Sequence, residues 1–113
     1  MSGNQEGRGL LPAGRAESLT DLLQLQPHGL VSRVIAKSGG ANVTLFAIDE
    51  GEGLSEHTTP YDALAIVLEG RLRILIAETA VTASAGQVVA MPAHVPHALH
   101  AEQPSRMMLV MMK

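Results

Sequence analysis

The sequence predicts an all-β fold, with short strands assembled into a sandwich or a barrel. Apolar segments of strand-like composition recur along the chain, and Gly, Pro, Ser and Asp turn residues separate them. This spacing is typical of sandwiches and barrels and differs from the strand–helix alternation of βαβ units. The chain has 113 residues and is 46% apolar, which is enough for one domain with one core.

The N-terminal segment does not follow this pattern. Residues 1–17 hold many Gly, Arg and Glu residues without apolar periodicity, and we expect a flexible tail there. Leu10 and Leu11 are apolar enough to dock on a neighbouring surface. The folded domain is expected to occupy residues 18–113.

A short helix is predicted directly after the tail. Ser18 is a preferred N-cap residue whose hydroxyl can accept a hydrogen bond from the Asp21 amide, and the Asp21 carboxylate suits the positive end of a helix. The leucines that follow share one helical face: Leu19, Leu22 and Leu23. Pro27 and Gly29 end the segment, so the helix is short.

The rest of the chain is predicted to form strands. We expect them at residues 31–37, 42–49, 63–69, 71–77, 80–83, 87–91, 97–101 and 106–112. The Ser-Gly-Gly-Ala loop at 38–41 favours a hairpin between the first two strands. Gly70 alone separates two strands, which indicates a tight hairpin that needs positive φ. Residues 49–56 carry four acidic side chains, and we expect a solvated loop.

The last predicted strand is apolar on both faces. One face holds Met107, Leu109 and Met111, and the other holds Met108, Val110 and Met112. One face should fill the core, and the other needs a cover because monomers rarely expose a contiguous apolar strip. We expect a homodimer interface there. The alternative is that the N-terminal helix of the same chain covers this face.

Composition excludes several classes of function. The formal net charge is −3, and Phe46 and Tyr61 are the only aromatic residues. Phosphate recognition needs clustered cations and single-strand binding needs stacking aromatics, so nucleic acid is not an expected partner. The chain lacks cysteine, which excludes disulfides and thiolate sites. It shows no signal peptide and no apolar run of membrane length, so we expect a cytoplasmic protein with no membrane partner.

Two histidine-bearing stretches carry the functional information. The first, residues 51–70, places His57 before an apolar run that ends at Gly70. The second, residues 86–101, runs from Gly86 through a Pro-Ala-His-Val-Pro segment to His97. Each joins a histidine to strand-like apolar residues and to Gly or Pro. Together they predict a small barrel with a histidine-bearing pocket.

These stretches resemble the two motifs of the cupin superfamily, in its small single-domain form. The residues in register are Gly51, His57 and Gly70 in the first motif and Gly86, Pro92 and His97 in the second. The likeness covers about residues 30–112. It implies a double-stranded β-helix, or jelly-roll, barrel, here preceded by the short helix. It also implies one divalent transition metal (Ni, Fe, Zn or Mn), bound by three histidines and a glutamate.

The chain departs from that ligand set. Thr59 stands in place of the second histidine and Ala63 in place of the glutamate, so His57 and His97 are the metal-ligand candidates that remain. Two neutral imidazoles hold a first-row metal only weakly without further ligands. Asp62 lies one position from the glutamate slot, and strand alternation aims it at the opposite face unless a bulge re-aims it.

Two positions of the second motif also differ from the family pattern. His94 replaces its second glycine and Ala101 replaces its terminal asparagine. We expect His94 in a loop at the barrel rim, His28 in an exposed turn and His100 on a solvent-facing side of its strand.

We therefore expect a small molecule to bind in the barrel, with or without a metal. The polar contacts are expected from His57, Thr59, Tyr61 and His97. Apolar walls are expected from Leu64, Ile66, Val88 and Leu99. Two alternatives stay open. One is a metal-dependent enzyme of dioxygenase or isomerase type, in which an imidazole can act as acid or base. The other is a non-catalytic dimer that senses a ligand or binds a protein partner.

Overall fold

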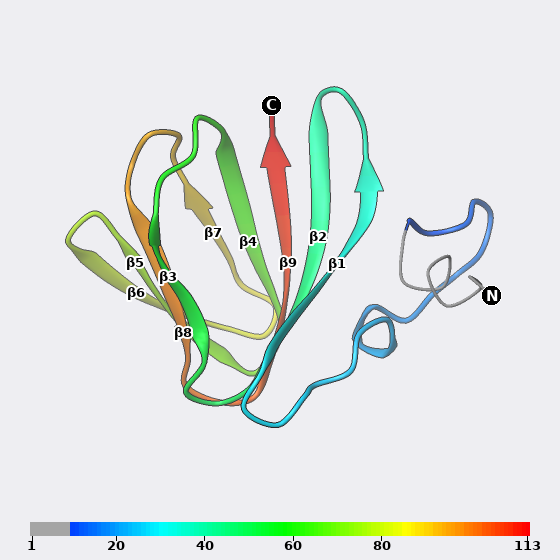
Figure 1. Cartoon of the computed structure of the whole chain (residues 1–113), viewed down its shortest axis with the longest axis horizontal. Helices are drawn as coiled ribbons and strands as arrows, with labels where there is room; N and C mark the ends of the chain where they lie inside the picture. The colour runs from blue at the N-terminus through cyan, green and yellow to red at the C-terminus, as the bar shows by residue number, and fades with distance from the viewer. Residues whose placement is uncertain (1–9) are drawn as a thin grey trace.

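The computed structural model describes residues 10–113, which form two antiparallel sheets facing each other (Figure 1). Sheet A has the strand order β1-β2-β9-β4-β7, and sheet B has the order β3-β8-β5-β6. In chain order the described elements are η1 (Leu19–Asp21), β1 (Leu30–Lys37), β2 (Ala41–Ile48), β3 (Gly53–His57), β4 (Asp62–Glu69), β5 (Arg71–Ile76), β6 (Thr79–Ser84), β7 (Val88–Met91), β8 (His97–Ala101) and β9 (Ser105–Met112). The chain crosses repeatedly between the sheets, as in a jelly-roll barrel.

The prediction of an all-β fold is confirmed, and each predicted strand has its counterpart. Strand β3 was not predicted, because it lies in the stretch interpreted as a solvated acidic loop. Its sequence, Gly-Leu-Ser-Glu-His, has no β-branched residue. It forms because β8 supplies an antiparallel partner on one side, so tertiary pairing overrides a weak local preference.

The core lies between the sheets, and strand β4 shows how it is built. Ala63, Ala65 and Val67 are buried, whereas Leu64 and Ile66 alternate with them and face outward. Paired residues of neighbouring strands share a face, and these three buried residues pair with Met111, Leu109 and Met107 of β9. The cluster of buried core residues contains Ile48, Ala63, Ala65, Val67, Leu72, Ile74, Ala83, Met91, Leu99, Ala101 and Met107.

Gly70 joins the two sheets and does not form the predicted hairpin. The predicted positive φ is confirmed, at 84°, but β4 ends in sheet A and β5 begins in sheet B. A β carbon at Gly70 would overlap the Ser105 hydroxyl and the Pro104 carbonyl oxygen. This corner is packed against the start of β9, so glycine is needed there for space as well as for conformation.

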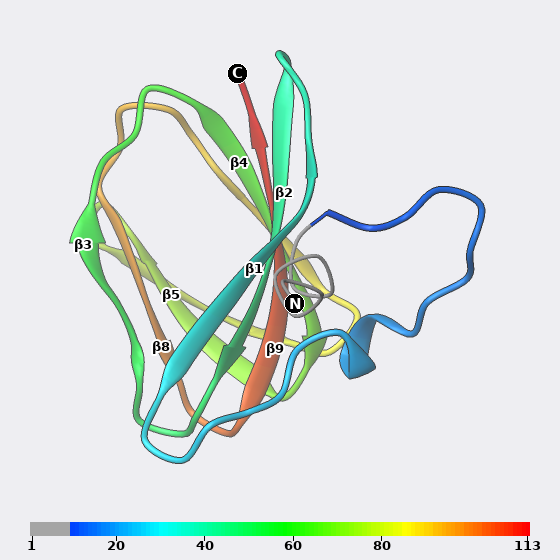
Figure 2. The same ribbon diagram turned by 45° about the vertical axis from the view of Figure 1, so that its right-hand side comes forward.

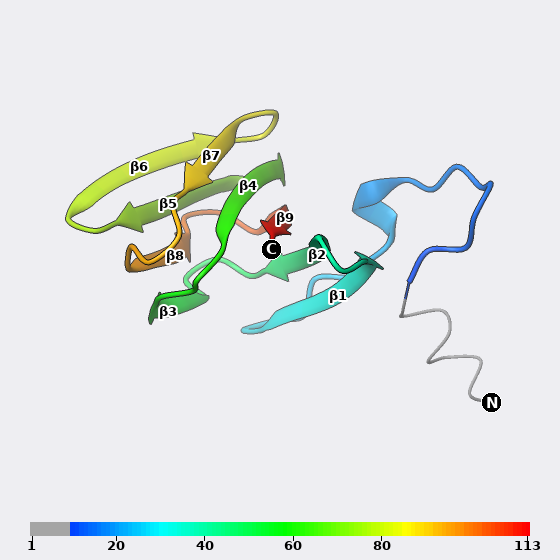
Figure 3. The same cartoon turned by 90° about the horizontal axis from the view of Figure 1, so that it is seen from above.

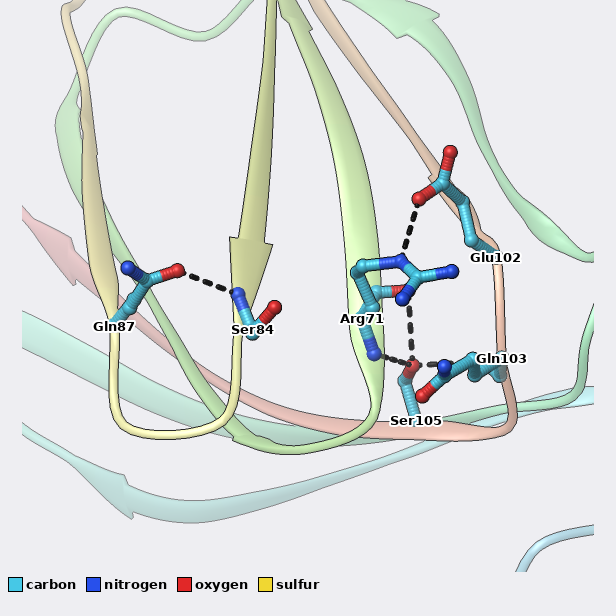
Figure 4. A network of polar contacts seen from close by, with 6 residues as sticks. All are labelled: Arg71, Ser84, Gln87, Glu102, Gln103 and Ser105. Atoms are coloured by element: carbon cyan, nitrogen blue, oxygen red, sulfur yellow. Dashed lines mark hydrogen bonds and ion pairs between the residues drawn. The ribbon is translucent and has the colours of Figure 1, made fainter.

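Ser105 ties this corner to β5 at the lower end of the barrel (Figure 4). Its side chain is fully buried. The hydroxyl oxygen accepts the Arg71 amide at 3.1 Å and lies 2.8 Å from the Gln103 carbonyl oxygen, to which the hydroxyl donates. Arg71 Nε also donates to Glu102 Oε1 at 2.9 Å. These contacts satisfy a buried hydroxyl that would otherwise destabilise the core.

Residues 10–28, called the N-terminal strap below, lie on the outer side of sheet A, and a loop before η1 extends away from the sheet (Figure 3). Hydrogen bonds to β1 and β9 fasten the strap at three points, and the His28 amide donates to the Asp49 carboxylate at its end. Two of its carbonyl oxygens, those of Leu22 and Leu23, accept from Arg33 Nη1 at 3.1 Å and Arg106 Nε at 3.0 Å. The third runs from the Leu11 amide to the Ile35 carbonyl oxygen at 3.0 Å.

The predicted helix is a single 3₁₀ turn, and its cap differs from the prediction. The main-chain oxygen of Ser18 accepts the Asp21 amide at 3.0 Å, and the Ser18 hydroxyl makes no cap hydrogen bond. Beyond Asp21, the carbonyl groups of Leu22 and Leu23 accept from arginine side chains of the sheet. Those carbonyls are therefore not available to continue a helix.

The strap covers part of the outer face of sheet A. This corresponds to the alternative prediction, in which the N-terminal segment of the same chain covers that face. Leu45 and Ala47 lie on this outer face by their register with β9, yet they are only 2% and 0% exposed. Val88 and Met112 remain 58% and 40% exposed. The cover is thus incomplete toward β7 and toward the upper end of β9.

The predicted tail falls only partly within the structure. Residues 1–9 lie outside the described residues, and the division of the chain into a tail and a domain stays a prediction. Within residues 10–113, no helix is long and apolar enough to cross a bilayer.

Candidate binding site

Strands β3 and β8 bring two histidines into contact at the upper end of the barrel. His57 ends β3 and His97 begins β8, and the two residues are paired partners. Their ring centroids are 4.3 Å apart with an interplanar angle of 69°, an edge-to-face contact. His97 is 6% exposed, whereas His57 is exposed. The predicted meeting of the two imidazoles on one face is therefore what the structure shows.

Strand register explains why the two rings lie on the same face. His97 pairs with Ile76 on β5, and the next inward pair on these strands is Leu99 with Ile74, which belongs to the core. A bulge lies between Leu54 and His57, so that His57 still meets His97. The alternation of β8 thus aims His97 at the interior and holds His57 beside it.

Main-chain carbonyl groups orient both rings. His57 Nδ1 lies 2.9 Å from the Ser55 carbonyl oxygen, and His97 Nδ1 lies 3.2 Å from that of Val95. A carbonyl oxygen can only accept, so each Nδ1 carries the hydrogen and donates it. In the neutral form each Nε2 then presents a lone pair. This arrangement prepares two acceptors for a ligand or a metal.

Thr59 and Tyr61 follow His57 closely in the chain, but their hydrogen bonds go elsewhere. The Thr59 hydroxyl donates to the Tyr61 carbonyl oxygen at 3.0 Å and accepts the Tyr61 amide at 3.3 Å. Among the described residues, neither side chain has a hydrogen bond to His57 or His97. Thr59 therefore stabilises a turn, and the assignment of both residues to ligand contacts stays a prediction.

The remaining family ligand position carries no donor atom. Ala63 faces the interior and is 4% exposed, so a methyl group stands in the slot of the family glutamate. Asp62 faces the other side, as alternation predicted, and its Oδ1 accepts the Ala93 amide at 2.8 Å. The register of β4 is unbroken at Asp62 and Ala63, so no bulge re-aims this carboxylate. It is bonded instead to the β7–β8 loop.

The other histidines lie where the sequence predicted. His28 and His94 are turn residues with φ of 59° and 65°. The His94 amide donates to the Thr59 carbonyl oxygen at 2.8 Å, which joins the β7–β8 loop to the β3–β4 loop. His100 is exposed and pairs with Arg73, which is also exposed. None of the three belongs to the site.

Three of the four predicted wall residues point away from the barrel. Leu64 and Ile66 face outward, and Val88, paired with Ile66, is 58% exposed. Leu99 is inward, as predicted, and is 6% exposed. The sequence could not choose the face because β4 and β9 are apolar on both sides. The inward residues nearest the upper end of the barrel are instead Ile76, Met91, Leu99 and Met111.

Sequence reasoning missed Asn42, a polar residue on the inner face of β2. It pairs with Met111, which in turn pairs with Ala63. Among the described residues, Asn42 Oδ1 is the one buried side-chain acceptor or donor without a hydrogen-bond partner. Alternation from Phe46 and Thr44 would have placed Asn42 on this face. An orphaned buried acceptor is costly unless something supplies a donor.

The donor set does not fit a resident divalent metal. Within residues 10–113, no group of three or more His, Cys, Asp or Glu side chains could hold a metal ion. Only two imidazole nitrogens converge, whereas transition-metal sites normally use three or four protein ligands. The expected metal stays a prediction that this set of donors does not favour.

A separate groove lies away from the histidines, between the strap and β1. It has a volume of about 540 Å³, within the size range of ligand sites. Its lining consists of Leu22, Leu23, Gln24, Gln26, Val31, Ser32 and Arg33. Arg33 is already engaged with the Leu22 carbonyl oxygen. We therefore place the candidate site at His57 and His97, where acceptors converge.

Comparison with known proteins agrees with the geometry. The model of the cupin domain family matches residues 44–113, more than half of the chain, and the chain belongs to this family. No curated protein matches it significantly.

Solved structures show the same fold. A conserved protein of unknown function from Streptococcus pyogenes has 29% sequence identity and a TM-score of 0.86, covering 91% of this chain and 90% of that one. A cupin superfamily protein from Desulfitobacterium hafniense has 25% identity and a TM-score of 0.84, covering 90% and 94%. An RmlC-like cupin from Shewanella frigidimarina has 16% identity and a TM-score of 0.72, covering 75% and 77%, which is a likeness of fold alone.

Proposed function

We propose that this cupin binds a small molecule at the upper end of its barrel, with His57 and His97 as the polar contacts and without a resident metal. One observation carries the proposal. Two rings from different strands meet at 4.3 Å with both Nδ1 atoms tied to carbonyl oxygens, so both Nε2 atoms remain to accept hydrogen bonds.

The accessibility of the rings supports this reading over a purely structural role. His97 is 6% exposed, but its Nε2 is not among the buried atoms that lack a partner. Since no protein group bonds to this nitrogen, it must be reached from solvent. His57 is exposed. A small molecule can therefore touch both rings while the apolar side chain of Ile76, the register partner of His97, lies beside them.

Ligand-observed NMR with a fragment library, run on chelator-treated protein, tests the proposal. We expect binders whose signals are lost in both His57→Phe and His97→Phe, and retained in His100→Phe, the matched change on the outward side of β8. Thermal unfolding of each variant checks that it is folded. Binders that are indifferent to both inward histidines would contradict the proposal.

We also propose that the chain forms a homodimer through the uncovered part of sheet A. Outward-facing apolar residues line up across three strands there: Leu64, Ile66, Val88, Met108 and Val110. The strap leaves Val88 58% exposed, and apolar strips of this kind often mark contacts between subunits.

Light scattering after gel filtration tests the dimer. Val88→Glu should shift the protein from dimer to monomer, because a charge cannot be buried unpaired in an apolar interface. Thr82→Glu, an exposed position on sheet B, should leave the mass unchanged. A wild-type monomer at high concentration would refute the interface.

A further inference from the structure

We infer that the ligand is an uncharged molecule that presents two adjacent hydrogen-bond donors, such as vicinal hydroxyl groups, to His57 and His97. This inference rests on the proposed function and names the class of ligand. It places a pair of ligand hydroxyls at the position where the resemblance to cupins implies a metal.

The protonation pattern of the rings determines which ligand chemistry fits. Both Nδ1 atoms donate to carbonyl oxygens, of Ser55 and Val95. The Nε2 atoms that remain can only accept while the rings are neutral. Because the ring centroids are only 4.3 Å apart, one small molecule that carries two donors can span both rings. A carboxylate or an ether would place the lone pairs of its oxygens against the lone pairs of the two Nε2 atoms.

Asn42 adds a third acceptor at the same end of the barrel. Its strand, β2 of sheet A, begins at the upper end of the barrel in Figure 1, across from β3 and β8 of sheet B. Asn42 faces inward in the row of Met111 and Ala63, and its Oδ1 is buried without a partner. A ligand with further hydroxyl groups would supply the donor that this oxygen lacks.

The charges at this end of the barrel favour a neutral ligand over an ammonium ion. Ala63 occupies the family's acidic slot, and the Asp62 carboxylate points outward to the Ala93 amide. Among the described residues no carboxylate is bonded to either ring, so an ammonium group would lack a paired counter-ion there. Lys37, paired with Asn42 on the same face, would repel it further.

Three probes of one shape separate these chemistries: cis-1,2-cyclohexanediol, its dimethyl ether, and cis-cyclohexane-1,2-dicarboxylate. Each is titrated into ¹⁵N-labelled, metal-free protein at alkaline pH, where imidazoles are neutral, and the Nε2 resonances are followed. We expect the diol to shift both His57 and His97. Each lost donor should weaken binding by roughly two- to tenfold, so the diether and the dicarboxylate should bind far more weakly.

Matched variants locate the effect. His57→Phe and His97→Phe should each abolish the diol response of the remaining inward ring, and His100→Phe should leave it unchanged. If a phenylalanine variant does not fold, the ring shifts of the wild-type protein decide the question alone.

The outcomes separate this inference from the proposed function. If the diether or dicarboxylate binds as tightly as the diol, or if only the fragment library yields histidine-dependent binders, the donor inference is wrong and the proposed function stands. If neither the probes nor the library moves the two rings, both fail. Zn²⁺ that survives gel filtration at one per chain and blocks the diol would overturn the metal-free site.

Discussion

Replacing Gly70 by alanine tests whether the corner between the sheets is packed as tightly as the structure shows. Gly70 has φ of 84°, and Gly86, in the turn before β7, has φ of 88°. A β carbon at Gly86 would meet nothing within 4 Å, whereas one at Gly70 would overlap Ser105 and Pro104. The two glycines therefore share a conformational requirement and differ only in the space around them.

The expected magnitudes follow from these two terms. An L-residue in the left-handed region costs about 1–2 kcal/mol, so Gly86→Ala should lower the free energy of unfolding by that amount. Gly70→Ala pays the same conformational term and adds overpacking, which costs about 1–3 kcal/mol in a tight site. The overlapping atoms include main chain of Pro104 and Ser105, so β9 itself must move. The total is about 2–5 kcal/mol.

Urea unfolding followed by circular dichroism at 25 °C measures both variants against the wild-type protein. A difference of 1 kcal/mol corresponds to about 4–8 °C in Tm for a domain of this size, which is readily resolved. Equal destabilisation by the two substitutions would refute the packed corner and leave only the conformational term. The m-values should agree among the three proteins, because a change in m would indicate altered compactness of a state.

Four further predictions test the core, the acid response and the site. Met107→Ala should cost about 2–5 kcal/mol because the side chain is 0% exposed, whereas Met112→Ala, at 40% exposure, should stay within about 0.5 kcal/mol; similar losses in urea unfolding would contradict the orientation of β9. The amides of His28 and Glu50 donate to the Asp49 carboxylate and lower its pKa. Its stabilisation is therefore present above the ordinary value of about 3.9 and is lost as the pH falls through the lowered value, and Asp49→Asn should flatten the acid decline of the urea midpoint. Thr59→His combined with Ala63→Glu should retain stoichiometric Zn²⁺ after gel filtration and gain Tm from it, whereas the wild-type protein should retain little; elemental analysis compares them, and equal zinc contents would be inconsistent with the donor argument. Chelator treatment should leave the wild-type Tm unchanged, and a fall of several degrees would contradict the metal-free site.

Strand positions could be predicted because turns and apolar runs are local signals. Strand β8, His97–Ala101, matches its predicted bounds, and Gly70 has the predicted positive φ. The sheet that a strand joins is not a local property. Gly70 marks a sharp change of direction whether the chain forms a hairpin within one sheet or crosses to the other sheet. Only the packing against Ser105 shows that the chain crosses from sheet A to sheet B.

The inner face of a strand could be predicted only where one face is polar. The outward direction of Asp62 was predicted correctly because the next residue, Ala63, occupies the family's inward-facing glutamate position. The Asp62 carboxylate accepts the Ala93 amide on the outer side. Ile66 and Val88 were placed on the wrong face because β4 and β7 are apolar on both sides. The second apolar face exists because the strap, and in our proposal a partner subunit, lies against it. A single sequence does not show which of two apolar faces packs on the core and which packs on the strap or a partner subunit.

The replacement of two family ligands has a structural counterpart at the upper end of the barrel. A metal held by residues of β3, β4 and β8 would connect those strands, and its loss would leave their loops free to separate. Here hydrogen bonds connect them instead. The Thr59 carbonyl oxygen accepts the His94 amide at 2.8 Å, and Asp62 Oδ1 accepts the Ala93 amide at 2.8 Å. The first bond joins the loop before β4 to the loop before β8, and the second joins the first residue of β4 to the same loop before β8. The two imidazoles can therefore keep their geometry without a metal, because the protein's own polar groups connect the strands that carry them.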